Sequence, residues 1–486
     1  MKKIVGRLAA LCLIALLWSC GGGDSTTTTV SGSGINSLGQ SPPVTLNPVQ
    51  TDNNLLVTVE DGPRGFNLIP NTNILYATVK VCSPTDTSQC VTIDHVQVDT
   101  GSVGLRILAS KVKSLNLPPV EVSSRPAFIT SLGKVPAANP VVQTYECYPF
   151  VIGGLWGANA QAVVGLGRQM TSPVAVHLIE DETDPLKAIQ SPADCTNKAD
   201  GKILSSAGAL GSNGILGVGS TNIDCGSVCL DGSYATNSSF VQYYGCLPGA
   251  ISIGECDTAA KVDVNLQVFN PISAFIDSRF TNGLVLAMPA VNDIGAASAS
   301  GELIFGVDSI ASGTSGLSNN TVPSSTNKIM LGTDPLNIHS YLNITTQLFR
   351  GSTTQIYTGS YLDTGTNGLF FNDNSGTPIP NCGGAGANVA AWYCPTNPGK
   401  LTLNAALTDG GSTFLNRVDL QFQVGNAEAL FSTSNTAFSN AAGTAPGSST
   451  DFAWGMPFFY GKRVYMSIWD ITVSGSATPW VTWVGI

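Results

Sequence analysis

The sequence is poor in charge and in histidine. Only 11% of its 486 residues are Asp, Glu, Lys or Arg, and the net charge at pH 7 is −10. Nucleic-acid binding needs clustered Lys and Arg, and the chain has no such cluster, so a nucleic-acid partner is disfavoured. The three histidines, His95, His177 and His339, are dispersed and no paired Cys-x-x-Cys spacing occurs, which disfavours a zinc site. We expect neither a metal nor an organic cofactor.

The sequence also lacks a second long apolar run beyond the one at its start. Three basic residues precede an apolar run over 8–18 that is too short to span a bilayer comfortably, which is typical of a signal peptide over 1–19. Residues 17–20 (LWSC) resemble a bacterial lipobox, in which Cys20 would be acylated and become the new N-terminus. Gly21 after it favours the outer membrane of a Gram-negative bacterium. An ordinary signal peptide without the lipid is the alternative.

The remaining chain is rich in residues that favour strands and turns. Residues 20–50 are dominated by Thr, Ser, Gly and Pro and predict a flexible tether. The rest is long enough for two cores, and we expect an N-terminal lobe over 51–275 and a C-terminal lobe over 276–486. Long amphipathic helices are scarce, so an all-β fold is expected. The strand-like runs include LYATVKV (75–81), CVTIDHVQVD (90–99), GELIFGV (301–307), VDLQFQV (418–424) and RVYMSIWDI (463–471).

The 12 cysteines support an exported chain with disulfides. One lies in the signal segment and one is Cys20, which leaves ten, an even number. Cys82 with Cys90 and Cys382 with Cys394 would close short loops and are predicted as pairs. The sequence leaves the partners of the other six open: Cys147, Cys195, Cys225, Cys229, Cys246 and Cys256.

One short pattern occurs twice. VQVDTGSVGLRIL (96–108) and SYLDTGTNGLFF (360–371) share an apolar residue, Asp-Thr-Gly, a hydroxyl residue, any residue, Gly and a further apolar residue. Two carboxyl groups held about 3 Å apart cannot both ionise and therefore share one proton. Such a pair can take a proton from water and give one to a peptide carbonyl. We therefore predict Asp99 and Asp363 as the catalytic pair of a peptide hydrolase.

The residues after each Asp suit a supporting role. Glycine lets the backbone approach a carboxylate, the threonine hydroxyls can bond to the opposite loop, and the next hydroxyl can donate to its own Asp. A single Asp-Thr-Gly is an ordinary turn, but two copies with matched flanks indicate a site. The supporting residues are Thr100, Gly101 and Ser102 in the first loop, and Thr364, Gly365 and Thr366 in the second.

These motifs resemble the pepsin-like aspartic proteases. NGILGVGS (213–220) and FAWGMPFFYGKRVYMSIWD (452–470) resemble the strands that thread through the two Asp loops, where Gly217 and Gly455 would permit close approach. GELIFGVDS (301–309) resembles the strand that opens the second lobe. The chain is also similar to a family of uncharacterised bacterial lipoproteins. The resemblance implies two pseudo-symmetric β-barrel lobes around a central cleft, and an endopeptidase acting on a peptide or an unfolded protein.

A departure from the family concerns its flap. YPFVIGGLWGANAQAVVGLG (148–167) resembles the hairpin that folds over substrate, with Gly153 and Gly154 near its turn. Aligned by this hairpin, Phe150 stands where the family carries tyrosine, so it has no hydroxyl to donate. This favours an alternative, a catalytically silent pepsin-fold protein that grips peptides or inhibits a secreted enzyme. Retention of both Asp residues with their hydroxyl partners favours the endopeptidase.

Two other enzyme classes fit less well. Actin-like and sugar-kinase ATPases also carry two Asp-x-Gly-Ser/Thr loops, but they need the alternating helices of an α/β fold and a supply of ATP, whereas the cysteine content indicates an oxidising compartment. A serine hydrolase needs a Gly-x-Ser-x-Gly turn and a positioned histidine, and the sequence offers neither.

Overall fold

The structure of the protein is a computed structural model. It describes residues 48–63, 72–123, 141–181, 189–198, 201–231, 242–250, 252–258, 260–308, 319–324, 328–332, 343–383, 389–396, 399–410, 416–470 and 478–486. The predicted signal peptide over 1–19, the lipidation residue Cys20 and the tether up to residue 47 lie outside these ranges. Across the described ranges, no helix is both long enough and apolar enough to cross a membrane.

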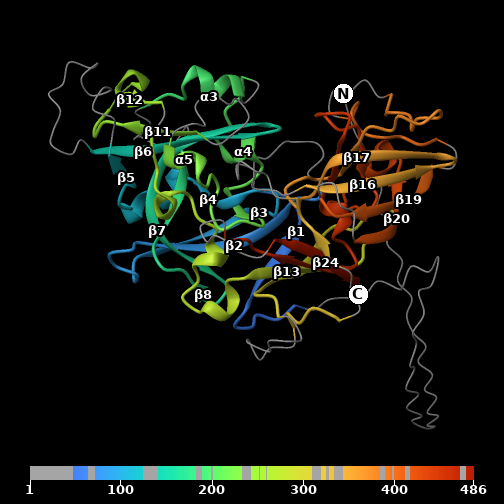
Figure 1. The fold of residues 1–486 in the computed structure, drawn as a ribbon, viewed down its shortest axis with the longest axis horizontal. Coiled ribbons are helices and arrows are strands. Elements are labelled where there is room, and N and C mark those ends of the chain that lie inside the picture. Colours follow the sequence, from blue (N-terminus) through green and yellow to red (C-terminus); the bar gives the residue numbers. More distant parts are fainter. Residues whose placement is uncertain are drawn as a thin grey trace, which may run out of the picture. The chain divides into compact units, whose positions relative to one another are not determined.

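The described chain folds mainly into strands that form two hydrogen-bonded sheets (Figure 1). The smaller sheet contains β16 (Ile344–Arg350), β17 (Thr353–Leu362), β18 (Leu369–Phe371), β19 (Lys400–Thr408), β20 (Arg417–Gly425), β21 (Ala442–Gly443) and β22 (Asp451–Trp454). The larger sheet contains β1 (Asn54–Val59), β2 (Leu75–Cys82), β3 (Cys90–Asp99), β4 (Val103–Leu108), β5 (Glu121–Ser123), β6 (Val141–Phe150), β7 (Gly153–Leu166), β8 (Gln169–Met170), β9 (Val174–Ile179), β10 (Gly214–Val218), β11 (Gln242–Cys246), β12 (Cys256–Asp257), β13 (Gly283–Met288), β14 (Ala299–Phe305), β15 (Ile329–Met330), β23 (Lys462–Ser467) and β24 (Trp480–Gly485).

The described helices are all short. The α-helices are α1 (Ala109–Val112), α3 (Ala193–Lys198), α4 (Ala207–Leu210), α5 (Val228–Asp231) and α6 (Ala427–Phe431). The 3₁₀-helices are η1 (Lys113–Leu115), η3 (Ile253–Glu255), η4 (Val264–Leu266), η5 (Pro271–Ala274), η6 (Ser278–Phe280) and η7 (Met456–Phe458). The predicted all-β class is therefore confirmed.

The larger sheet joins the two halves of the sequence. β1 lies between β2 and β14, because Val57 is the register partner of both Ala77 and Gly301. From β14 the sheet continues through β13 and β23 to β24. The larger sheet thus contains β1, which ends before residue 60, together with β13, β14, β23 and β24 from the second half of the sequence. The division of the lobes at residue 275 stays a prediction.

Burial in the strands explains why these residues form sheets. β20 alternates charged or polar residues with apolar ones, which suits a strand with one face toward solvent. β4 (VGLRIL) is buried along its whole length, on both faces, although it contains Arg106. An arginine inside such a strand needs polar partners, because an unpaired buried charge is very costly.

Five disulfides join the ten cysteines of the described chain. The predicted pairs Cys82–Cys90 and Cys382–Cys394 are confirmed. The six cysteines that the sequence left open form Cys147–Cys195, Cys225–Cys229 and Cys246–Cys256. Disulfides persist in oxidising compartments, so this set indicates an exported protein.

Candidate active site

The two Asp-Thr-Gly loops occupy the same place in two matching arrangements of strands. β3 ends at Asp99, the chain returns as β4, and β10 runs between them, parallel to β3 and antiparallel to β4. The second loop, at Asp363, follows β17 and returns as β18, with β22 parallel to β17 and antiparallel to β18. Two loops of one design, one in each sheet, give the chain its bilobal pepsin-like fold.

A glycine beside each threaded strand leaves room for the loop. A Cβ atom on Gly217 would lie 2.6 Å from the backbone nitrogen of Val103. A Cβ atom on Gly455 would lie 2.2 Å from the carbonyl oxygen of Gly368 and 2.4 Å from that of Thr366. Backbone atoms cannot move aside easily, so any side chain at either position would displace an Asp loop.

The loops bond to each other through their threonines. The N–H of Thr100 donates to Oγ1 of Thr364 at 3.0 Å, and the N–H of Thr364 donates to Oγ1 of Thr100 at 3.0 Å. Each hydroxyl then donates across the interface, from Thr100 to the carbonyl of Leu362 at 3.3 Å and from Thr364 to that of Val98 at 2.8 Å. Four hydrogen bonds therefore fix the position of one loop against the other.

Each Asp carboxylate has the same two donors from its own loop. One oxygen accepts from the backbone N–H two residues on, and the other accepts from the hydroxyl three residues on. The distances are 2.7 Å from Gly101 and 2.5 Å from Ser102 to Asp99, and 2.7 Å from Gly365 and 2.5 Å from Thr366 to Asp363. This matched bonding orients both carboxyl groups.

The two carboxyl groups meet across the loops. A Cβ atom on Gly101 would lie 2.6 Å from Cγ of Asp363, and one on Gly365 would lie 2.5 Å from Oδ1 of Asp99. Asp99 is buried, whereas Asp363 keeps part of its surface in contact with solvent. The structure thus brings together the eight residues predicted in the two loops.

Burial and the neighbouring carboxyl group change the acidity of Asp363. Burial, the charge of Asp99 and a hydrogen bond with Asp99 raise the pKa of Asp363 well above its usual value. The Thr366 hydroxyl and the Gly365 N–H oppose this rise in pKa but do not cancel it. Asp363 therefore retains its proton at pH values where an isolated aspartic acid would be ionised.

The predicted flap is the hairpin of β6 and β7. Phe150 pairs with Gly153 across its turn and packs on Tyr148, with ring centroids 4.8 Å apart. Gly154 donates to the carbonyl of Lys202 at 2.9 Å and accepts from the N–H of Leu204 at 2.8 Å. Contacts of these described residues thus tie the turn to a neighbouring loop. Their role over a substrate stays a prediction.

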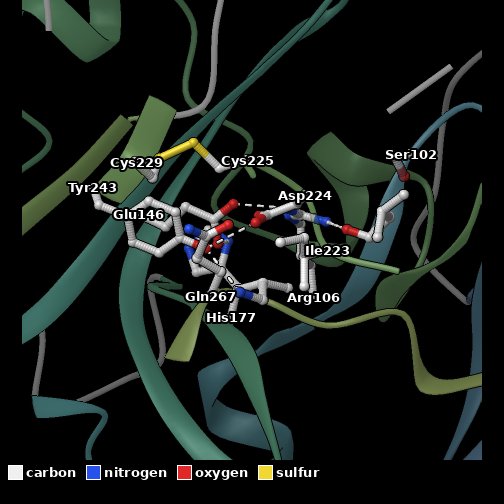
Figure 2. Close-up of polar contacts among 12 residues, drawn as sticks. Ser102, Arg106, Glu146, His177, Ile223, Asp224, Cys225, Cys229, Tyr243 and Gln267 are labelled. Atoms are coloured by element: carbon white, nitrogen blue, oxygen red, sulfur yellow. Dashed lines mark hydrogen bonds and ion pairs between the residues drawn. A yellow bond between two sulfur atoms is a disulfide. The ribbon is translucent and has the colours of Figure 1, made fainter. Parts of the chain in front are cut away.

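A buried cluster of charged side chains, not predicted from the sequence, lies near the first loop. Arg106, Glu146, His177 and Asp224 come from different parts of the chain and converge in Figure 2. All four side chains are fully buried. The feature of the sequence that points to this cluster is Arg106, a charged residue within the apolar strand β4.

One group of described residues has the composition of a metal site. Ligand atoms of Cys382, Cys394 and Glu428 lie within 4.8 Å of one another. The two sulfur atoms are bonded to each other, so they are not thiolate ligands.

Comparison with known proteins places the chain in a family. A family model described as "Protein of unknown function (DUF3443)" matches residues 49–483. The chain belongs to this family. A comparison with curated proteins finds no match to this DUF3443 chain. Among solved structures it is similar to the crystal structure of an aspartic proteinase from Irpex lacteus, with 14% identity, a TM-score of 0.41, and coverage of 89% of this chain and 96% of that one.

Proposed function

We propose that this protein is an aspartic endopeptidase whose catalytic residues are Asp99 and Asp363. The observation that supports the proposal best is the contact of the two carboxyl groups, each lying against the glycine of the opposite loop. The raised pKa of Asp363 divides the roles, because one acid carries the proton while the other serves as base.

The proposed reaction proceeds in two steps. The Asp99 carboxylate takes a proton from a water molecule while its oxygen attacks the carbonyl carbon of the scissile peptide bond, and Asp363 gives its proton to the carbonyl oxygen. The resulting tetrahedral diol collapses: one of its hydroxyl groups returns a proton to Asp363, the C–N bond breaks, and the amine leaves with the proton that Asp99 had accepted. The products are a new carboxyl terminus and a new amino terminus.

In this proposal the supporting residues have the roles predicted from the sequence. The threonines at 100 and 364 hold the loops in register, and Ser102 and Thr366 orient the carboxylates. Gly217 and Gly455 leave room for the threaded strands. In this proposal Phe150, Gly153 and Gly154 form a flap over an extended peptide or an unfolded protein.

The proposed location is the cell envelope. A signal peptide over 1–19 and acylation of Cys20 would attach the protein to the outer membrane through the tether, with lobes over 51–275 and 276–486. Mass spectrometry of the mature N-terminus tests this, because an acylated Cys20 supports the anchor and a different, unmodified terminus contradicts it.

The peptidase proposal is tested with an unfolded protein substrate across acidic to neutral pH. We expect cleavage that is greatest in acid, is blocked by a statine-type inhibitor, and is lost in Asp99→Asn and Asp363→Asn. The matched control is Asp419→Asn, an exposed carboxylate in β20 bonded to Arg417, which should cleave like wild type. Cleavage that survives both active-site substitutions would refute the assignment.

A silent binding protein is the second candidate. Phe150 lacks a flap hydroxyl, and the hairpin is tied to its surroundings by Cys147–Cys195 and by the bonds of Gly154. A folded preparation that binds peptide or inhibits a secreted enzyme, yet cleaves nothing, would favour this candidate.

A further inference from the structure

Arg106 is a fully buried guanidinium in β4, the strand that leaves the first Asp loop. Its Nη1 donates to the carbonyl of Val103 at 2.5 Å, and its Nη2 donates to Glu146 at 2.7 Å and to Asp224 at 3.0 Å (Figure 2). The ring of Tyr148 lies 3.7 Å from the guanidinium carbon. One side chain therefore joins the end of the loop, strand β6 of the hairpin, and the segment before α5.

The contact with Val103 acts close to the catalytic pair. Val103 follows Ser102, whose hydroxyl donates to Asp99 at 2.5 Å. On the other side, the Ser102 carbonyl accepts from the N–H of Gly219 at 2.8 Å. Arg106 and Gly219, the residue after β10, thus donate hydrogen bonds to two consecutive backbone carbonyls, those of Val103 and Ser102. A shift of this stretch of backbone would move the hydroxyl that orients Asp99.

His177 and Tyr243 contact the two acids of the cluster. His177 Nδ1 lies 3.3 Å from Glu146, and the hydroxyl of Tyr243 donates to Asp224 at 3.0 Å. Burial and the charge of Glu146 raise the pKa of Asp224 well above its usual value, while burial lowers the pKa of His177 to about 4. Both shifts in pKa favour the uncharged forms of Asp224 and His177 beside the buried guanidinium.

At the equivalent position of the second half, the described structure has an apolar residue instead of an arginine. Phe370 stands seven residues after Asp363, as Arg106 stands seven residues after Asp99. Phe370 packs on Trp392, with ring centroids 5.0 Å apart. Since buried ion pairs rarely stabilise a fold more than apolar packing does, the fold itself does not require the charge at this position. In the first half, the residue at this position instead contacts the β6–β7 hairpin, through Glu146 and Tyr148.

We infer that Arg106 is a positioning residue that couples the Asp99 loop to the β6 strand of the hairpin. The inference rests on the proposed peptidase function for its effect on rate. Its effect on the geometry of the carboxyl pair does not depend on that function. An arginine suits this role because its planar fork reaches several acceptors at once, whereas a lysine offers one point charge.

The test compares Arg106→Lys with wild type in two measurements. We expect kcat on a peptide substrate to fall by roughly 10²-fold, the loss that a misplacement of about 1 Å produces. Independently of activity, we expect the titration of the Asp363 carboxyl, followed by ¹³C NMR, to shift, because Asp99 is displaced. Tyr148→Leu is the second variant, since it removes the ring that lies over the guanidinium from the hairpin side. It should shift the same titration in the same direction, by less.

The matched control is Arg350→Lys, which weakens the ion pair to Asp373 at 3.0 Å in the second half. It should lose stability but leave the Asp363 titration unchanged. If folded Arg106→Lys and Tyr148→Leu proteins also keep the wild-type titration, the inference is overturned and the cluster is only structural. If wild type cleaves nothing, the peptidase proposal fails, while a shifted titration still supports the coupling and an unshifted one still refutes it.

Discussion

Thr100 and Thr364 donate their backbone N–H groups to each other's hydroxyl at 3.0 Å in both directions. The two residues are 264 positions apart in the sequence and fully buried. Because each hydroxyl also donates onward, neither threonine can move alone without leaving a buried polar group unpaired. This pair therefore sets the distance between the two carboxyl groups.

Thr100→Val should weaken both the fold and the site. Valine has nearly the same shape but leaves the N–H of Thr364 and the carbonyl of Leu362 without a partner, which costs about 1–3 kcal/mol for each buried group. Urea unfolding measures the loss. Thr100→Ser keeps the hydroxyl and is the control. Equal stability of the valine and serine variants would contradict the role of the hydroxyl.

Gly365→Ala should separate the carboxyl pair. The added methyl group would lie 2.5 Å from Oδ1 of Asp99, closer than real contacts permit, so Asp99 or the loop must shift. We expect peptidase activity to be lost. Gly376→Ala adds the same atom where no other atom lies within 4 Å and should behave like wild type. An active Gly365→Ala enzyme would show that the carboxyl contact is not required.

Asp363→Asn should become more stable relative to wild type as pH rises. The pKa of Asp363 is raised on folding, so the folded state holds this proton more tightly than the unfolded chain does. The tighter binding of this proton stabilises folded wild-type protein fully in acid. The stabilisation is lost as pH rises through the pKa that Asp363 has in the folded state. Asparagine does not titrate. Urea unfolding of both proteins from about pH 3 to about pH 8 checks this, and a difference independent of pH would contradict it.

His177 should make the wild-type protein less stable in acid. Burial lowers its pKa from 6.5 to about 4, so the unfolded chain takes up the proton first as pH falls. The free energy of unfolding should decrease between those pH values by roughly 3 kcal/mol. His177→Gln removes this titration and should show a smaller decrease, measured by denaturation at each pH. An identical decrease in both proteins would assign it to other groups.

The fold and the Asp loops could be predicted because their signals are local. Alternating apolar residues mark strands such as β2 and β3 directly, and the Asp-Thr-Gly pattern is complete within a few residues. The pairs Cys82–Cys90 and Cys382–Cys394 were also predictable, since each closes a short loop.

The buried cluster could not be predicted, because its members meet only in the folded sheet. Arg106 bonds to Glu146 and Asp224, which lie 40 and 118 residues further along the chain. Nothing near either acid marks it as a partner. The pairing of Cys147 with Cys195 depends in the same way on where α3 packs against the hairpin.

The pairing of β1 with a strand far along the chain means that the larger sheet can be completed only late in synthesis. One edge of β1 is hydrogen-bonded to β14, more than two hundred residues later, and the N–H of Asp363 is held by the carbonyl of Trp454 at 3.0 Å. Contacts so distant in sequence form slowly. When only the first half has been synthesised, one edge of β1 is unpaired. We therefore expect chains truncated before residue 454 to be aggregation-prone and inactive.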